Sequence, residues 1–268
     1  MSASRTVIAS LPGLPHHDTS ARDLSACRPA VGIRDNGAVA DTLESIRNFA
    51  RAGRNDLVIF DLDGTLTDSA AGVVASFRHA LLTIGMAVPE GDLASRVVGP
   101  PMHVTLQEMG LGEYADAAIA AYRADYVSRG WSMNRPYPGI PELLADLQVG
   151  GVRLAVATSK AEPTARRILA HFDLEGHFEV IAGASLDGAR SSKADVLAHA
   201  LTQLAPLPER VVMVGDRSHD VEGAATHGIG TIVAGWGYGH DDFTDVGGSD
   251  GALMHLATVD DLREVLGA

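Results

Sequence analysis

The sequence predicts an α/β protein with a parallel sheet, interrupted after its first strand by a helical insertion. Short apolar runs recur along the chain, each run ends at a turn signal, and helical stretches lie between the runs. Short continuous apolar runs are typical of strands that are buried on both faces, as in parallel sheets. Their alternation with helices indicates βαβ units.

The first expected strand, residues 57–60, runs directly into Asp61 and the turn residue Gly64. Later apolar runs also end at small or polar residues, so these residues are expected at one edge of the sheet. The expected strands are residues 57–60, 153–157, 178–181, 211–214 and 230–233. The helices expected between them are residues 139–149, 162–171, 193–204 and 219–227.

Residues 72–137 do not follow this alternation of strands and helices and are predicted to form a helical cap. Val73, Phe77 and Leu81 follow one helical stripe, and a second stripe runs through residues 114–126. Ligands of open α/β sheets bind beyond the carboxyl ends of the strands, so an insertion after the first strand would cover the site. A helical hairpin packed elsewhere is the alternative.

The expected core is then residues 56–71 and 138–268. Residues 1–37 are rich in Ser, Ala, Pro, Asp and Arg and show no apolar period, so we expect them to be disordered. Residues 38–55 are expected to hold a short helix and a linker, because apolar residues recur there at helical spacing.

The composition excludes several classes of function. The 268 residues include 21 Lys and Arg against 34 Asp and Glu, a net charge of −13 with no basic block, which argues against binding to nucleic acid or anionic membranes. No apolar run approaches the ~18 residues of a membrane-spanning helix. Cys27 is the one cysteine, and the N-terminus shows no export signal, so we expect a cytoplasmic protein.

Carboxylates, a hydroxyl and an ammonium are expected together at the edge of the sheet. These residues are Asp61, Asp63, Thr158, Lys193, Asp216 and Asp220. Crowded carboxylates repel one another and need a cation, and a few oxygen ligands suit Mg²⁺. A turn starting after Asp61 would let this residue act as nucleophile while Asp63 moves protons. Lys193 and Thr158 can then interact with a transferring phosphoryl group.

Each of these residues also has a structural explanation when it is taken alone. The Asp-x-Asp-Gly run can be an acidic turn, and Thr158 can cap the following helix. Lys193 can be a solvated surface residue, and Asp216 and Asp220 can be a loop charge and a helix-start charge. The catalytic interpretation depends on the joint arrangement, since the residues fall in order along the chain at expected strand ends and, for Lys193, at the head of a helix.

Four motifs together resemble the haloacid dehalogenase superfamily. Residues 61–69, Asp-Leu-Asp-Gly-Thr-Leu-Thr-Asp-Ser, are similar to its first motif, and residues 157–160, Ala-Thr-Ser-Lys, to its second. Lys193 is similar to its third motif, and residues 215–220, Gly-Asp-Arg-Ser-His-Asp, to its fourth. The resemblance covers residues 55–266 and implies a Rossmann-like, doubly wound core with an inserted helical cap.

The resemblance also implies roles for the acidic residues. It implies Asp61 as the phosphorylated nucleophile and Asp63 as the general acid and base. It implies Mg²⁺ held by Asp61, the carbonyl of Asp63 and Asp216, with Asp220 as a supporting acid. Dehalogenase members lack an acid two residues after the nucleophile, so Asp63 favours phosphoryl transfer over cleavage of a carbon–halogen bond.

The remaining site residues are less specific. Phosphatases of this type often have Pro just after the lysine of the third motif, whereas Ala and Asp follow Lys193, so Lys160 is the alternative lysine. Thr158, Ser159 and Lys160 are expected to bind substrate. Arg96 on the cap is a further candidate for substrate binding, with a surface salt bridge as the alternative.

A closer resemblance is to a branch of the superfamily described as protein tyrosine kinases. It rests on the runs 63–102, 155–168 and 235–239. It implies ATP as donor, phosphorylation of the protein itself, and a low-molecular-weight protein tyrosine phosphatase as partner. The alternatives are a phosphatase for small phosphomonoesters, of phosphoglycolate or nucleotide type, and a silent binding module, against which the complete acid set argues.

Three tyrosines lie where a functional role is possible. Tyr238, in the loop after the last expected strand, is a possible phosphoacceptor, and packing against Trp236 is the alternative. Tyr122 and Tyr126 lie one helical turn apart and are expected to be packing residues of the cap.

Overall fold

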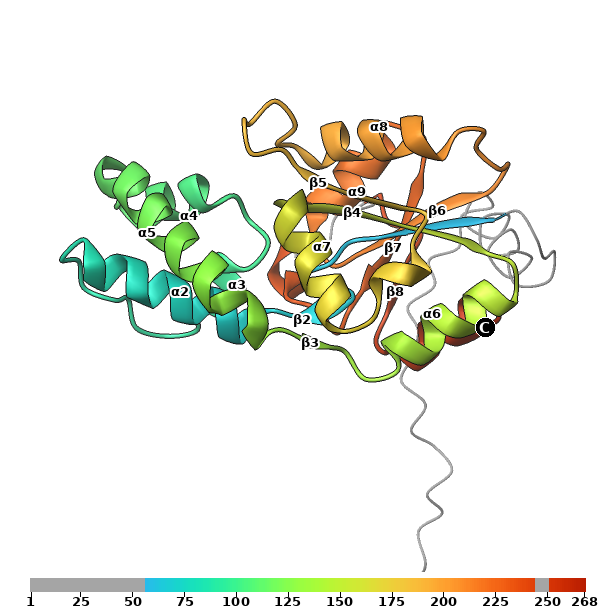
Figure 1. Ribbon diagram of the computed structural model, residues 1–268, viewed down its shortest axis with the longest axis horizontal. Coiled ribbons are helices and arrows are strands. Elements are labelled where there is room, and N and C mark those ends of the chain that lie inside the picture. Colours follow the sequence, from blue (N-terminus) through green and yellow to red (C-terminus); the bar gives the residue numbers. More distant parts are fainter. Residues whose placement is uncertain (1–55, 244–250) are drawn as a thin grey trace, which may run out of the picture. The chain divides into compact units, whose positions relative to one another are not determined.

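The computed structural model describes residues 56–243 and 251–268, which belong to one compact unit of the chain, Asn36–Ala268 (Figure 1). The expectations for residues 1–37 and 38–55, including Cys27, lie outside the described residues. Within the described ranges, every helix is too short or too polar to cross a membrane.

A sheet of six parallel strands forms the centre of the core, in the order β5-β4-β1-β6-β7-β8. The strands are β1 (Leu57–Phe60), β4 (Arg153–Ala161), β5 (Val180–Ala184), β6 (Val211–Gly215), β7 (Gly230–Ala234) and β8 (Met254–Leu256). Strand β1 lies between β4 and β6, with Leu57 opposite Arg153 and Val211. The residues that follow β1 are therefore central in the sheet edge.

Helices cover both faces of this sheet (Figure 1). They are α6 (Ile140–Val149), α7 (Glu162–His171), α8 (Lys193–Leu204), α9 (Ser218–Ala225) and α10 (Val259–Leu266). Because side chains of a strand alternate between faces, Val58 and Phe60 pack with α6, α7 and α10, whereas Leu57 and Ile59 pack with α8 and the end of α9. The predicted doubly wound α/β fold is confirmed.

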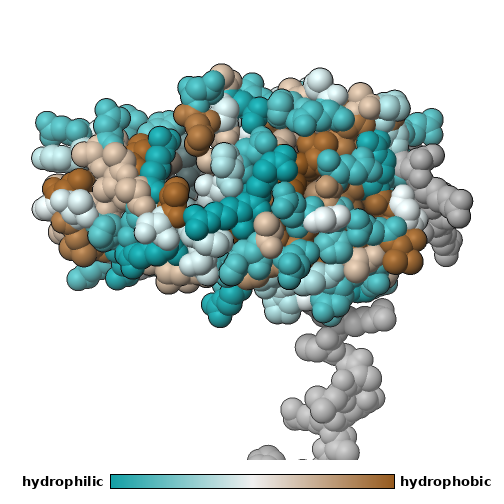
Figure 2. Space-filling view, viewed as in Figure 1, coloured by the Kyte–Doolittle hydropathy of each residue, from teal (hydrophilic) through white to brown (hydrophobic). Residues whose placement is uncertain are grey.

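Residues 70–133 form the inserted helices. They are α2 (Ala70–Thr83), α3 (Ala94–Val97), α4 (Met102–Glu108) and α5 (Ala115–Ser128), with the 3₁₀ turns η1 (Gly112–Tyr114) and η2 (Gly130–Met133). Their buried residues, among them Phe77, Leu106 and Tyr126, form an apolar cluster separate from those of the sheet. Hydrophilic residues cover much of the face drawn in Figure 2, with smaller hydrophobic areas between them.

Several elements differ from the sequence expectations. A two-stranded antiparallel ribbon, β2 (Thr67–Asp68) and β3 (Arg135–Pro136), joins the inserted helices to the core and was not predicted, since two residues show no period. Strand β4 continues past residue 157, and β5 begins two residues later than expected. Strand β8 and helix α10 were also missed. The remaining 3₁₀ turns are η3 (Glu175–His177) and η4 (Gly239–Phe243).

Candidate active site

A tight turn after β1 places Asp61 at the centre of the sheet edge. The backbone N–H of Asp61 donates to Val214 O of the neighbouring strand at 2.8 Å. The chain then turns back, with the N–H of Gly64 donating to Thr67 O at 2.8 Å. Gly64 has a φ of +84°, and a Cβ atom there would overlap the carboxylate of Asp216. The turn thus needs glycine both for its conformation and for the approach of Asp216.

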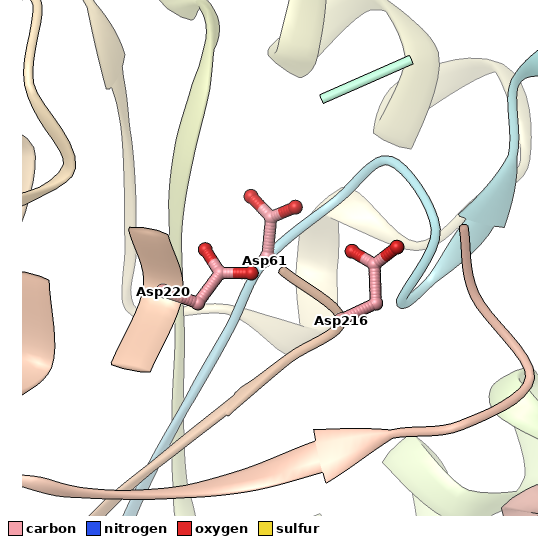
Figure 3. A group of neighbouring side chains, drawn as sticks. All are labelled: Asp61, Asp216 and Asp220. Atoms are coloured by element: carbon pink, nitrogen blue, oxygen red, sulfur yellow. The ribbon is translucent and has the colours of Figure 1, made fainter. Parts of the chain in front are cut away.

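Three buried carboxylates meet at this edge (Figure 3). Asp61 follows β1, Asp216 follows β6 and Asp220 lies in the first turn of α9, and one carboxylate oxygen of each lies within 4.8 Å of the others. Their exposed fractions are 5%, 1% and 0%. Oδ1 of Asp216 is buried without a hydrogen-bond partner among the described residues. This all-oxygen set fits a hard divalent cation such as Mg²⁺.

Lys193 offsets part of the charge of this cluster. It begins α8, is 4% exposed, and its Nζ lies 2.7 Å from Asp61 Oδ1 and 2.6 Å from Asp220 Oδ1. Nζ also donates to Ala157 O at 2.9 Å. The structure therefore brings Lys193 to the two carboxylates, and the surface explanation for this lysine is wrong.

The protonation of these groups reflects burial and their neighbours. Burial raises the pKa of Asp61, and Asp220 and Asp63 add to the rise, whereas Lys193 opposes it. Burial likewise raises the pKa of Asp216 well above 3.8, with contributions from Asp220 and Asp61. Burial acts to raise the pKa of Asp220 too, but Lys193, His219 and the hydrogen bond from the N–H of Arg217 together outweigh it, and the pKa is lowered. A bound cation would favour the charged forms of Asp61 and Asp216.

The side chain of Asp63 lies against a second lysine. Its Oδ2 is 2.7 Å from Lys160 Nζ, and Nζ also donates to the hydroxyl of Tyr126 at 2.9 Å. Burial acts to lower the pKa of Lys160, but Asp63, Tyr126 and Tyr122 together outweigh it, and the pKa is raised. Lys160 is thus paired with Asp63 and Lys193 with Asp61, so the two lysines are not alternatives for one position.

Tyr126 is a site residue that the sequence analysis missed. It is 4% exposed in the apolar cluster of the inserted helices, as expected of a packing residue, and its ring stacks on Tyr122 with centroids 5.5 Å apart. Its hydroxyl nonetheless reaches Lys160 in the core. A helical stripe shows which residues are buried, but it carries no signal for this contact.

The other residues of the second motif and Arg96 have varied surroundings. Thr158 is 1% exposed, and its Oγ1 accepts from the N–H of Lys160 at 3.2 Å. Ala161 is the N-cap residue of α7, so the capping alternative for Thr158 is wrong. Ser159 is half-buried, whereas Arg96 is exposed on α3. Substrate binding by Thr158, Ser159 and Arg96 stays a prediction.

Tyr238 joins the acidic cluster to the inserted helices. Its N–H donates to Asp216 Oδ2 at 2.7 Å, and its hydroxyl donates to Asp68 Oδ1 at 2.6 Å. The same hydroxyl accepts from the N–H groups of Ser69 and Ala70 at 2.9 and 3.0 Å, where α2 begins. Phosphorylation of Tyr238, which stays a prediction, would require these bonds to break.

Arg217 of the fourth motif is a second contact that was not anticipated. It is 7% exposed, and Nε lies 2.9 Å from Asp242 Oδ2. The guanidinium donates to the carbonyls of Val98, Ser95 and Tyr238 at 3.1, 3.4 and 3.4 Å. Arg217 therefore binds the chain between α3 and α4 to the loop after β7.

Comparison with known proteins agrees with this geometry. The family model described as haloacid dehalogenase-like hydrolase matches residues 58–234. The tyrosine-protein kinase PtkA of Mycobacterium tuberculosis is 61% identical, over 94% of this chain and 93% of the relative. A 5'-nucleotidase of Pseudomonas aeruginosa is 39% identical, over 69% of this chain and 85% of the relative.

Solved structures show the same relationship. The structure of Mycobacterium tuberculosis protein tyrosine kinase A is 69% identical, with a TM-score of 0.73 over 80% of this chain and 99% of that one. A predicted phosphatase from Clostridium acetobutylicum is 36% identical, with a TM-score of 0.72 over 79% and 97% of the two chains. The family-model match, residues 58–234, spans the inserted helices and includes Asp61, Lys193, Asp216 and Asp220. This chain is therefore an enzyme of the haloacid dehalogenase-like hydrolase family.

Proposed function

We propose that this chain catalyses Mg²⁺-dependent phosphoryl transfer through a phosphoaspartate at Asp61. The observation that carries the proposal is the buried group of Asp61, Asp216 and Asp220 with Lys193 2.7 Å from Asp61. A carboxylate beside a fixed ammonium and a candidate cation site suits nucleophilic attack on a phosphoryl group, whose negative charge both cations would offset.

The two half-reactions use the same residues. An oxygen of Asp61 attacks phosphorus, the bond from phosphorus to the leaving oxygen breaks, and Asp63 gives a proton to that oxygen. An acceptor hydroxyl or water then attacks the phosphoaspartate, Asp63 takes the acceptor's proton, and the Asp61 carboxylate is released. Asp63 is 14% exposed at its side chain and can therefore reach a leaving group or an acceptor.

The residues present would hold Mg²⁺ through the carboxylates of Asp61 and Asp216 and the carbonyl of Asp63. Asp220, which pairs with Lys193 and accepts from the N–H of Arg217 at 3.0 Å, would act as a supporting acid. When bound, the ion would neutralise charge on the carboxylates and on the oxygens of the phosphoryl group.

Water is the acceptor that family membership supports. Relatives named 5'-nucleotidase and phosphoglycolate phosphatase are 39% and 29% identical to this chain. The proposed activity is therefore hydrolysis of small phosphomonoesters, of nucleotide or phosphoglycolate type, and the natural substrate is a phosphorylated small molecule.

A tyrosine hydroxyl is the second candidate acceptor. The observation that favours it is the 61% identity, over most of both chains, to relatives named tyrosine-protein kinase. In this case ATP would supply the phosphoryl group, and the acceptor would be Tyr238 or a low-molecular-weight protein tyrosine phosphatase. The phosphoaspartate is a mixed anhydride and can transfer to either acceptor, so the exclusion of water would decide between them.

A side-by-side assay with Mg²⁺ tests both candidates. One arm offers a panel of phosphomonoesters and the other offers labelled ATP with the partner phosphatase, and Asp61→Asn is the control in each. Turnover in the first arm alone contradicts the kinase, and label on tyrosine alone contradicts the phosphatase. Full activity of Asp61→Asn in the productive arm would contradict the phosphoaspartate itself.

A further inference from the structure

We propose that Lys160 and Tyr126 form a subsite for an oxyanion on the leaving group of the substrate, a carboxylate or a second phosphate beyond the oxygen that is released. The inference rests on the proposed function, in which Asp63 gives a proton to that oxygen. It adds a specificity determinant that is shared between the core and the inserted helices.

The first observation is the position of the Lys160 ammonium group beside Asp63. Lys160 Nζ lies 2.7 Å from Asp63 Oδ2, so any leaving group that Asp63 protonates passes close to this cation. Nζ is also 2.9 Å from the hydroxyl of Tyr126 and 4.6 Å from the centroid of its ring. Asp63 comes from the turn after β1 and Tyr126 from α5, so the ammonium is held from both sides.

The second observation is that Lys160 and Tyr126 have hydrogen-bond donors without a partner among the described residues. An ammonium has three N–H groups, and among the described residues Lys160 Nζ has two oxygen partners, Asp63 and Tyr126. The hydroxyl of Tyr126 accepts from Lys160 and, at 3.4 Å, from Asn134 Nδ2, which leaves its own hydrogen for another oxygen. The pair therefore retains two donors for a bound oxyanion.

The third observation is the excess of carboxylates over cations around the phosphoryl position. Asp61, Asp216 and Asp220 place three carboxylates beside the phosphoryl position, where Lys193 pairs with the first and the last. An additional anion on the substrate would be repelled by this cluster unless a cation lay on the leaving-group side. The side chain of Lys160 is 9% exposed, so its charge is only weakly screened by solvent.

The test compares substrates whose leaving groups do or do not carry this charge. With the full chain and Mg²⁺, kcat/KM is measured for 2-phosphoglycolate and for its uncharged amide, 2-phosphoglycolamide. Pyrophosphate against methyl phosphate forms a second arm, which distinguishes a phosphate from a carboxylate as the oxyanion. Intrinsic reactivity is the same for every variant, so the change in each ratio between variants isolates the contact.

We expect the native chain to prefer the charged member of at least one pair, and Lys160→Met to reduce that preference about ten- to a hundredfold, the value of a charged hydrogen bond. Lys160→Arg should keep most of the preference because it keeps the charge. Tyr126→Phe keeps the ring and loses the hydroxyl, so it should give a smaller reduction.

Arg167→Met is the matched control. This variant also removes a cation that contacts α5: Arg167 is exposed on α7, and its guanidinium donates to Val127 O at 2.8 Å and lies 3.7 Å from the centroid of the Trp131 ring. It should leave both ratios unchanged. Equal changes in Arg167→Met and Lys160→Met would overturn the proposal, because they would indicate a general disturbance of the inserted helices.

Equal turnover of both members of each pair, or a ratio that Lys160→Met leaves unchanged, would also overturn it. If Lys160→Met turns over neither member, the ratio of the two dissociation constants is measured instead. It is measured for the Asp61→Asn variant and for the double variant that carries Asp61→Asn and Lys160→Met. Failure of the proposed function gives a different result. In that case the native chain shows no Mg²⁺-dependent turnover, or its turnover is unaffected by Asp61→Asn.

Discussion

The Nζ atom of Lys193 lies 2.7 Å from Oδ1 of Asp61, the proposed nucleophile, and both side chains are buried. We predict that Lys193→Met lowers kcat for any phosphoryl donor by about a hundredfold or more, as expected for loss of a fixed charge at the reacting group. Steady-state kinetics check this. Lys193→Arg is the control for charge, and a Lys193→Met variant with native kcat would contradict the role of the ammonium.

Asp63→Asn should separate the two half-reactions. With a donor whose leaving group needs no proton, such as 4-nitrophenyl phosphate, the phosphoaspartate should still form, but its hydrolysis should slow because water is no longer deprotonated. Rapid-quench experiments should then show a burst of 4-nitrophenolate and label on Asp61. The absence of a burst together with native turnover would indicate that Asp63 is not the proton-transfer group.

Mg²⁺ should stabilise the protein in a pH-dependent manner. Burial, with Asp220 and Asp61, raises the folded-state pKa of Asp216 above its unfolded value of 3.8. The folded, metal-free protein therefore binds a proton that the unfolded chain has lost, and its stability falls as pH rises from 3.8 through the raised value.

Because Mg²⁺ binds the charged carboxylates, its shift of the melting temperature should be larger at about pH 8 than at about pH 5. Thermal denaturation with Mg²⁺ and with a chelator measures this, and Asp216→Asn is the control, which should show little shift at either pH. A shift that is independent of pH in the native chain would contradict the prediction.

Gly64→Ala should disturb the site more than its backbone strain alone explains. Gly64 and Gly85 both have positive φ, +84° and +77°, but only at Gly64 does a Cβ atom overlap Asp216, since at Gly85 nothing lies within 4 Å. Gly85→Ala should cost roughly 1 kcal/mol in the free energy of unfolding, and Gly64→Ala clearly more. Urea denaturation measures both, and Gly64→Ala should also weaken Mg²⁺ binding.

Arg217→Met should loosen the chain between α3 and α4. It leaves the carbonyls of Ser95 and Val98 and the carboxylate of Asp242 without this guanidinium, at a cost of about 2–4 kcal/mol in the free energy of unfolding. Limited proteolysis should show faster cleavage near Val98. The exposed Arg96→Met is the matched control and should be cleaved at the native rate.

The strands and the acidic residues at their ends could be predicted because the sequence signals for them are local. The run 57–60 is apolar throughout, ends at Asp61, and is a buried strand in the structure. Boundaries were less accurate where packing extends a strand, as in β4, whose continuation to Ala161 follows pairing with Ala184 of β5. Strand β8 is short and only partly buried, so it lacks a clear pattern.

The sequence alone determined the fold class and the carboxylates at the strand ends, because periodicity and turn residues act over a few neighbouring positions. Tertiary structure decided the pairing: Lys193 with Asp61 and Asp220, Lys160 with Asp63 and Tyr126. It also decided that Arg217 and Tyr238 reach the inserted helices. Such contacts join segments far apart in the chain, and their geometry depends on how the sheet and the inserted helices pack rather than on local residue preferences.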